Sequence, residues 1–101
     1  MLKLKYLPLA LKDLRNIISY IVDHLKAPKA AMDLVDTLDN SILRLQQFPF
    51  SCRLYQAMGP LDIEYRMLSV KNYLVFYVVT ELEVEIHRII YSKMNLVSAV
   101  K

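Results

Sequence analysis

This sequence has little of what several common kinds of functional site need. It holds a single glycine, Gly59, and one glycine cannot build a loop that cradles phosphate groups. Its single cysteine, Cys52, excludes an internal disulfide and a cysteine-based zinc site. The two histidines, His24 and His87, do not have the spacing of metal ligands. We therefore expect no metal and no cofactor, and we interpret Cys52 as a small loop residue.

Long apolar runs are also missing. A membrane-spanning helix needs about 18 or more consecutive apolar residues, whereas Lys71 and Asn72 precede the most apolar run and Glu81 follows it. Near the N-terminus the apolar run is broken by Lys12 and Asp13, which argues against a signal peptide. We expect a cytoplasmic protein with no membrane segment.

Apolar residues, in contrast, are abundant. They make up 55% of the 101 residues, which is a high share for a lone soluble domain. A chain of this length has room for one domain, residues 1–101, and we expect part of its apolar surface to be covered by another protein. The 13 basic and 10 acidic residues are spread along the chain, so the net charge of +3 permits contact with nucleic acid or an acidic protein without requiring either.

The C-terminal half carries the pattern of a three-stranded antiparallel meander. Between residues 62 and 94, β-branched and aromatic residues recur at nearly every second position, with breaks at residues 70–72 and 81–82. The central run, residues 73–79, is apolar at both parities, so neither face of that strand is expected to meet water. One face needs helices from the same chain, and the other needs more chain or a partner.

The N-terminal half predicts one strand and two helices. Residues 2–6 alternate apolar and basic, as an edge strand does. Pro8 opens a helix that ends near Ala27, because Pro28 disfavours an α conformation in the residue before it. Pro28 opens a second helix that runs to about Phe48. The expected buried stripes are Leu11, Leu14, Ile18, Ile21 and Leu25 in the first helix and Ala31, Leu34, Leu38, Ile42 and Leu45 in the second.

These elements predict an α+β domain with the order β-α-α-β-β-β. Two amphipathic helices with almost no linker form an antiparallel αα-hairpin, and its apolar side is expected to pack on one face of a twisted antiparallel sheet. If the first strand lies beside the last one, the sheet has four strands. Residues 49–61 are predicted to be a loop, and a loop of this length is often functional or ordered by a partner.

Two arginines within apolar strands are the first candidates for function. Arg66 and Arg88 have the planar guanidinium group that binds phosphate through two parallel hydrogen bonds. The alternative for each is a salt bridge to Glu64, Glu83 or Glu85, or simple exposure to solvent on a wet strand face.

Tyr91 and His87 are the candidates for acid–base chemistry, because both lie close to Arg88 in the sequence. Metal-free RNA cleavage needs a group that moves protons and a guanidinium that stabilises the charge on phosphorus. The alternative is that Tyr91 caps the core and that His87 is an ordinary surface residue.

Short motifs in a fixed order resemble the RelE/ParE superfamily of toxins from type II toxin–antitoxin modules. The resemblance covers nearly the whole chain. Its pieces are Ala10, Asp13-Leu14, Ile17 and Tyr20 in the first helix, Phe48-Pro49 after the second, Tyr65-Arg66, residues 75–78 and residues 84–91.

This resemblance implies one of two activities. The ParE branch, which is more similar through Phe48-Pro49 and residues 84–91, inhibits DNA gyrase and has no hydrolytic activity of its own. The RelE branch cleaves mRNA on the ribosome, and there the resemblance implies catalytic roles for Arg66, Tyr91 and His87. The lysines that RelE-type enzymes carry before the second strand are missing here, which favours the ParE branch.

The resemblance also implies a partner and a set of contact residues. An antitoxin is expected to wrap the toxin in a hetero-oligomer, with DNA reached only through the antitoxin and the antitoxin-binding residues left unassigned. Arg53, Arg66, Arg88 and Lys93 are the predicted target-binding or phosphate-binding residues. A third possibility is a toxin-like fold that retains only the partner-binding activity.

Overall fold

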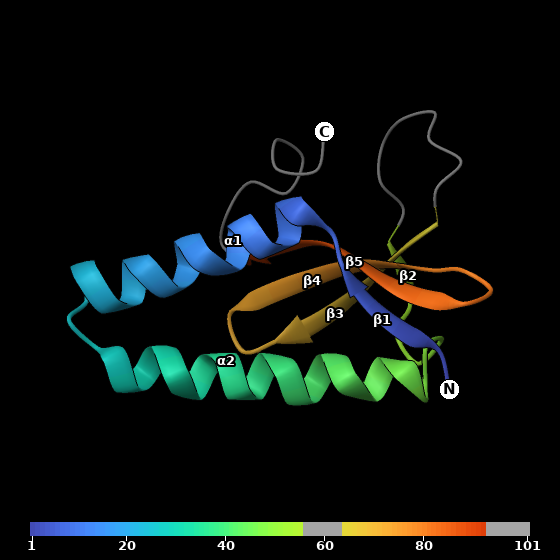
Figure 1. Ribbon diagram of the computed structural model, residues 1–101, viewed down its shortest axis with the longest axis horizontal. Helices are drawn as coiled ribbons and strands as arrows, with labels where there is room; N and C mark the ends of the chain where they lie inside the picture. The colour runs from blue at the N-terminus through green and yellow to red at the C-terminus, as the bar shows by residue number, and fades with distance from the viewer. Residues whose placement is uncertain (56–63, 93–101) are drawn as a thin grey trace.

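Five strands form one sheet, and two antiparallel helices cover one of its faces (Figure 1). The structure is a computed structural model that describes residues 1–55 and 64–92. The strand order across the sheet is β1-β5-β4-β3-β2. The strands are β1 (Lys3–Tyr6), β2 (Leu54–Tyr55), β3 (Tyr65–Val70), β4 (Tyr73–Val79) and β5 (Glu83–Tyr91).

The predicted α+β class and the β-α-α-β-β-β order are confirmed, with two differences in the sheet. The first strand does lie beside the last one, but β1 and β5 run parallel, so the sheet is mixed. A fifth strand, β2, forms within the predicted loop and pairs with Tyr65 and Arg66 of β3. A two-residue strand is too short for a period-two pattern to reveal it.

The helices form the expected hairpin, with a change of geometry at its tip. The first helix is α1 (Pro8–Ser19), which continues as a π-helical turn, η1 (Tyr20–His24). The second helix is α2 (Pro28–Leu43), which ends in a 3₁₀ turn, η2 (Arg44–Gln46). Lys26 has a φ of 53°, and the N–H of Ala27 donates to the carbonyl of Ile21, which closes the first helix.

The buried face of α2 is the predicted one, and that of the first helix is the predicted one in part: Ile21 is buried and Leu14 and Ile18 pack against the core. All five stripe residues predicted for the second helix are buried, from Ala31 to Leu45. In the first helix the fully buried position is Ala10, while Leu11 and Leu25 are exposed. The N–H of Leu25 bonds to the carbonyl of Tyr20, five residues back, so the wider π turn rotates Leu25 out of the helical stripe.

The main core lies between the helical hairpin and the sheet, and a smaller cluster lies on the other face. Leu74, Phe76 and Ile90 are buried in that second cluster, with side chains of the same chain packed against them: Tyr55, Tyr65 and Met67. Of the two coverings expected for this face, more chain or a partner, the chain itself supplies the one at its centre. Large aromatic residues of the strands themselves shield it.

A register shift between β4 and β5 affects the candidate residues directly. Phe76 pairs with Arg88, whereas the next residue, Tyr77, pairs with Ile86. His87 therefore has no residue opposite it and forms a β-bulge, which redirects side chains near it. Within the described residues, no helix combines the length and apolar character needed to cross a membrane.

Candidate functional site

Arg88 is bound by a carboxylate from the first helix. Its Nε donates to Asp13 Oδ2 at 2.7 Å and its Nη2 donates to Asp13 Oδ1 at 3.0 Å. The hydrogen bond to Asp13 raises the pKa of Arg88 above its ordinary value, although partial burial acts in the opposite direction. Asp13 Oδ2 also accepts from the backbone N–H of Ile89 at 3.0 Å, so one carboxylate fastens α1 to β5 beyond the end of β1.

Arg66 is bound without a carboxylate. Its Nη1 donates to the carbonyl oxygen of Cys52 at 2.7 Å, and its guanidinium carbon lies 4.9 Å from the centre of the Phe50 ring. Arg66 pairs with Tyr77 across the β3–β4 ladder, on the face that the hairpin covers. Burial raises the pKa of Tyr77, and the charge of Arg66 lowers it in part.

His87 lies in a hydrogen-bonded row on the second face of the sheet. Its Nδ1 is 3.2 Å from the hydroxyl of Tyr65, and its Nε2 is 3.3 Å from Glu85 Oε1. The Tyr65 and His87 rings meet edge to face with centroids 5.2 Å apart. Both ring nitrogens of His87 are thus engaged by neighbouring side chains.

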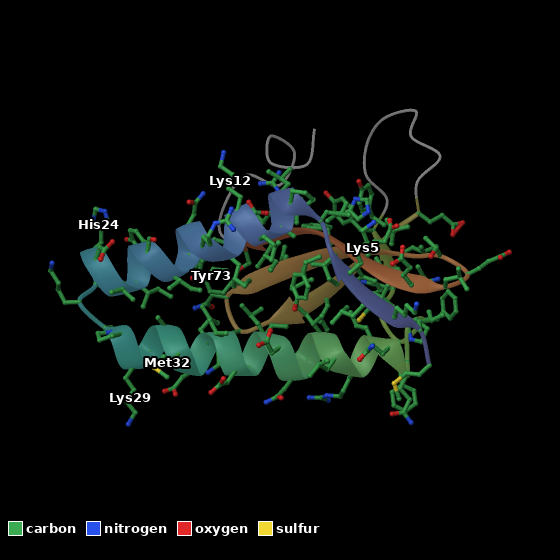
Figure 2. All side chains as sticks on the ribbon, viewed as in Figure 1. Lys5, Lys12, His24, Lys29, Met32 and Tyr73 are labelled. Atoms are coloured by element: carbon green, nitrogen blue, oxygen red, sulfur yellow. The ribbon has the colours of Figure 1, made fainter. Side chains whose placement is uncertain are left out.

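Tyr91 lines an apolar groove near the tip of the helical hairpin, where the first helix connects to α2. The groove has a volume of about 780 Å³, and its lining includes Tyr20, Leu34, Tyr73 and Tyr91. The rings of Tyr73 and Tyr91 lie 5.5 Å apart, and Figure 2 shows Tyr73 between the two helices. Burial, followed by the proximity of Tyr91 and Tyr20, raises the pKa of Tyr73.

The residues predicted for catalysis do not come together. Arg66 pairs with Tyr77 of β4, and Tyr91 pairs with Tyr73 of the same strand. Four strand residues separate those two rows, which is about 13 Å at 3.3 Å per residue. His87 contacts Tyr65, whose side chain packs in the second-face cluster rather than with the core around Tyr77.

The remaining predicted contact residues are placed as follows. Arg53 is exposed, next to β2. Lys93 lies outside the described residues, as does the part of the predicted 49–61 loop from residue 56 onwards. In the described parts of the chain, no group of three or more His, Cys, Asp or Glu side chains lies close enough to hold a metal ion.

Sequence reasoning did not find the partners of the two arginines. The alternative to phosphate binding by Arg88 was a salt bridge to Glu64, Glu83 or Glu85 or exposure to solvent, and its partner in the structure is Asp13, 75 positions away. The available signal was Asp13 itself, an acidic residue one helical turn after Ala10, which is buried. The contact of Arg66 with the Cys52 carbonyl is a backbone contact, which has no signature in side-chain identity.

An αα-hairpin packed on a five-stranded mixed sheet, in a chain of 101 residues, defines a toxin-type domain of the RelE/ParE superfamily. The family model described as ParE toxin of the type II toxin–antitoxin system, parDE, matches residues 4–96. The chain therefore belongs to the ParE toxin family.

A solved structure supports this assignment. It is described as the chromosomal ParDE TA system from P. aeruginosa, and the two folds superpose with a TM-score of 0.72 at 25% sequence identity. The similarity covers 92% of this chain and 98% of that chain. No curated protein matches the sequence.

Proposed function

We propose that this ParE-family toxin inhibits bacterial growth in the cytoplasm by binding DNA gyrase, without hydrolysing nucleic acid itself, and that a cognate antitoxin neutralises it. Membership in a toxin family of a type II toxin–antitoxin system supports an antitoxin as one partner, and the resemblance to the ParE branch is the reason to propose gyrase as the other. The choice between gyrase binding and RNA cleavage depends on the geometry of the candidate residues.

The separation of Arg66 from Tyr91 is the observation that carries this choice. A general acid or base must lie within hydrogen-bond reach of the proton it moves, and the charge-stabilising cation must contact the same phosphate. The backbone rows of the two residues lie about 13 Å apart along β4. The guanidinium of Arg66 contacts the Cys52 carbonyl and the Phe50 ring, whereas Tyr91 lies against Tyr73, so in this arrangement the two groups do not face a common phosphate. His87 does not bridge them, because its two ring nitrogens face Tyr65 and Glu85.

The state of the two arginines also supports binding rather than phosphoryl chemistry. The charge of Arg88 is paired with Asp13, which leaves little attraction for a phosphate. Arg66 keeps its charge but is occupied by the Cys52 carbonyl and the Phe50 ring. Both guanidinium groups therefore have structural partners.

An antitoxin has an apolar surface to cover. The groove lined by Tyr20, Leu34, Tyr73 and Tyr91 is large and mostly apolar, and a segment that folds on binding can bury such a surface. We expect the complex to be a hetero-oligomer in which any contact with DNA is made by the antitoxin.

The proposal is tested by inducing the chain in cells and adding it to purified gyrase. We expect a DNA-damage response, filamentation, and inhibited supercoiling by gyrase, with intact transcripts. The conservative variant Tyr91→Phe and the variant His87→Ala should inhibit growth as strongly as the native chain. Translation arrest with cut transcripts, and its loss in Tyr91→Phe, would instead establish the mRNA endonuclease.

A further inference from the structure

A hollow with both polar and apolar lining residues lies at the C-terminal end of α2, beside β3. Its volume is about 410 Å³, and its lining includes Arg44 and the three serines Ser41, Ser51 and Ser69. None of its lining residues, all of them in the described part of the chain, is acidic. Arg44 thus has no carboxylate among the residues that line the hollow with it, and an uncompensated cation is suited to an anionic group.

The edge of β3 adds backbone donors to this end of the molecule. The N–H of Met67 donates to the carbonyl of Arg53 at 3.4 Å, at the place where β2 runs beside β3. The N–H of Ser69 points to the same edge by the two-residue period of a strand, and Ser69 lines the hollow. A carboxylate in the hollow would thus meet donors from both main chain and side chains.

Two exposed phenylalanine rings belong to the same loop as the hollow, whose lining includes Phe48 and Ser51, the residue that follows Phe50. Phe48 is 56% exposed, and Phe50 is 66% exposed. Two side chains of the sheet hold the loop that carries these rings. Tyr77 Oη donates to the Pro49 carbonyl at 3.0 Å, and Arg66 donates to the Cys52 carbonyl. Exposed aromatic rings on an ordered loop lose little entropy on binding and are typical of energetically dominant contacts between proteins.

The charge of this segment indicates the chemistry of its partner. Residues 40–55 contain Arg44 and Arg53 and no aspartate or glutamate. A nucleic acid would need several cations along a backbone track, whereas the hollow has one arginine in its lining. One cationic hollow beside two apolar rings fits a protein segment that carries an acidic and an apolar side chain.

We propose that this α2-end surface, formed by Arg44, Phe48 and Phe50 around the hollow, docks an acidic segment of the toxin's protein target. A carboxylate of the target enters the hollow at Arg44, and a neighbouring apolar side chain packs on the two rings. The loop of this surface is held by hydrogen bonds before binding, which suits a folded target, whereas the mostly apolar groove at the other end of α2 suits a segment that folds on binding. This inference rests on the proposed function, in which the chain acts by binding a protein.

The test uses two variants of the full chain and a matched control for each. Phe48→Ser with Phe50→Ser removes the rings, and Arg44→Gln removes the cation. The controls are Met32→Ser, which alters a side chain that is 69% exposed, and Lys29→Gln, which removes one exposed charge. Both control residues project from α2 on the side away from α1 (Figure 2).

We expect each test variant to bind purified gyrase about tenfold or more weakly, as truncation of a dominant contact does. Growth inhibition should weaken in parallel, while antitoxin binding and the circular-dichroism spectrum stay as in the native chain. The melting temperature should be unchanged in Arg44→Gln and slightly lower in the double variant, which loses the contact of Phe50 with Arg66. The two controls should match the native chain in every assay. If the double variant does not fold, Arg44→Gln alone decides, because it changes one exposed side chain.

Unchanged affinity for gyrase and unchanged growth inhibition in both test variants would overturn the inference. So would selective loss of antitoxin binding, or selective loss of binding to a single-stranded oligonucleotide, since each would assign the surface to another partner. If the native chain fails to bind gyrase, the proposed function fails, and the surface is then judged by growth inhibition alone. Weakened inhibition still supports a docking surface for a different protein target, and full inhibition removes it.

Discussion

The regions around Arg88 and Arg66 show how two similar sequence contexts lead to different electrostatic outcomes. Both arginines lie in apolar strands next to an aromatic or histidine residue. Arg88 meets the carboxylate of Asp13 from α1, so its charge is compensated. Arg66 contacts a carbonyl oxygen and a phenyl ring, so its side chain is held in place without a carboxylate that compensates its charge. The difference comes from remote segments that the strand sequences do not contain.

The largest effect should follow from breaking the Arg88 region. Asp13→Ala leaves the guanidinium of Arg88 and the N–H of Ile89 without their acceptor. We expect a loss of about 3 kcal/mol in the free energy of unfolding, measured by urea denaturation, as for other partly buried pairs broken on one side. The control Asp36→Ala removes an exposed carboxylate from α2 and should change stability by less than about 0.5 kcal/mol. Equal effects of the two substitutions would show that the pairing with Arg88 contributes nothing.

A smaller effect is expected when the Arg66 region is broken. Arg66→Ala removes one charge-assisted hydrogen bond to the Cys52 carbonyl and the contact with Phe50. These contributions together amount to about 2 kcal/mol. Urea denaturation of Arg66→Ala and Asp13→Ala side by side checks the ranking. A larger loss for Arg66→Ala would mean that the carbonyl and ring hold the loop more strongly than the carboxylate holds α1.

Replacement of the Phe50 ring tests how much of the Arg66 contribution comes from the cation–π contact. Phe50→Leu keeps an apolar side chain beside the guanidinium and removes the π face. A cation–π contact at an exposed site is worth about 0.5–1 kcal/mol, and we expect a loss in that range by denaturation. The same substitution combined with Arg66→Ala should cost nothing further. Additive losses in the double variant would show that Phe50 acts independently of Arg66.

The same distinction between local pattern and remote contact explains what the sequence predicted. The stripe of α2 was predicted in full because a regular helix with one buried face obeys the 3.6-residue period. The stripe predicted for the first helix was wrong at Leu11, because Ala10 is the residue that packs against the core there. It was also wrong at Leu25, because the π turn interrupts the 3.6-residue period. The bounds of β4, predicted at residues 73–79 and found there, followed from an apolar β-branched and aromatic run between two polar breaks.

The sequence identified the candidate residues by their chemistry, but it did not predict which of them lie close together. Their distances depend on register, and the bulge at His87 changes the register of β5 against β4. Alternation along a strand does not reveal where one strand gains an extra residue. The four-row separation of Arg66 from Tyr91 follows from pairings that only the folded sheet fixes.

The smallest expected effect concerns the stability at alkaline pH and involves two tyrosines, Tyr6 and Tyr77. Like the two arginines, they differ in the charge of the side chain beside them. Tyr6 Oη donates to Asp39 Oδ1 at 3.5 Å, and burial, followed by the negative charge of Asp39, raises the pKa of Tyr6 to about 12. Tyr77 differs because the retained charge of Arg66 opposes the rise that burial causes in its pKa. A carboxylate neighbour and a cation neighbour thus act on the two phenols in opposite directions.

The Tyr6 contribution to stability has a definite sign. Its folded pKa of about 12 lies above the unfolded value of about 10. The stabilisation is therefore fully present below pH 10 and is lost as the pH rises towards 12. Because Tyr6 is partly exposed, we expect only about 0.5 kcal/mol less alkaline loss in Tyr6→Phe than in the native chain between pH 9 and 10.5. Urea denaturation at the two pH values measures it, and identical slopes for the two proteins would remove Tyr6 from the account of alkaline stability.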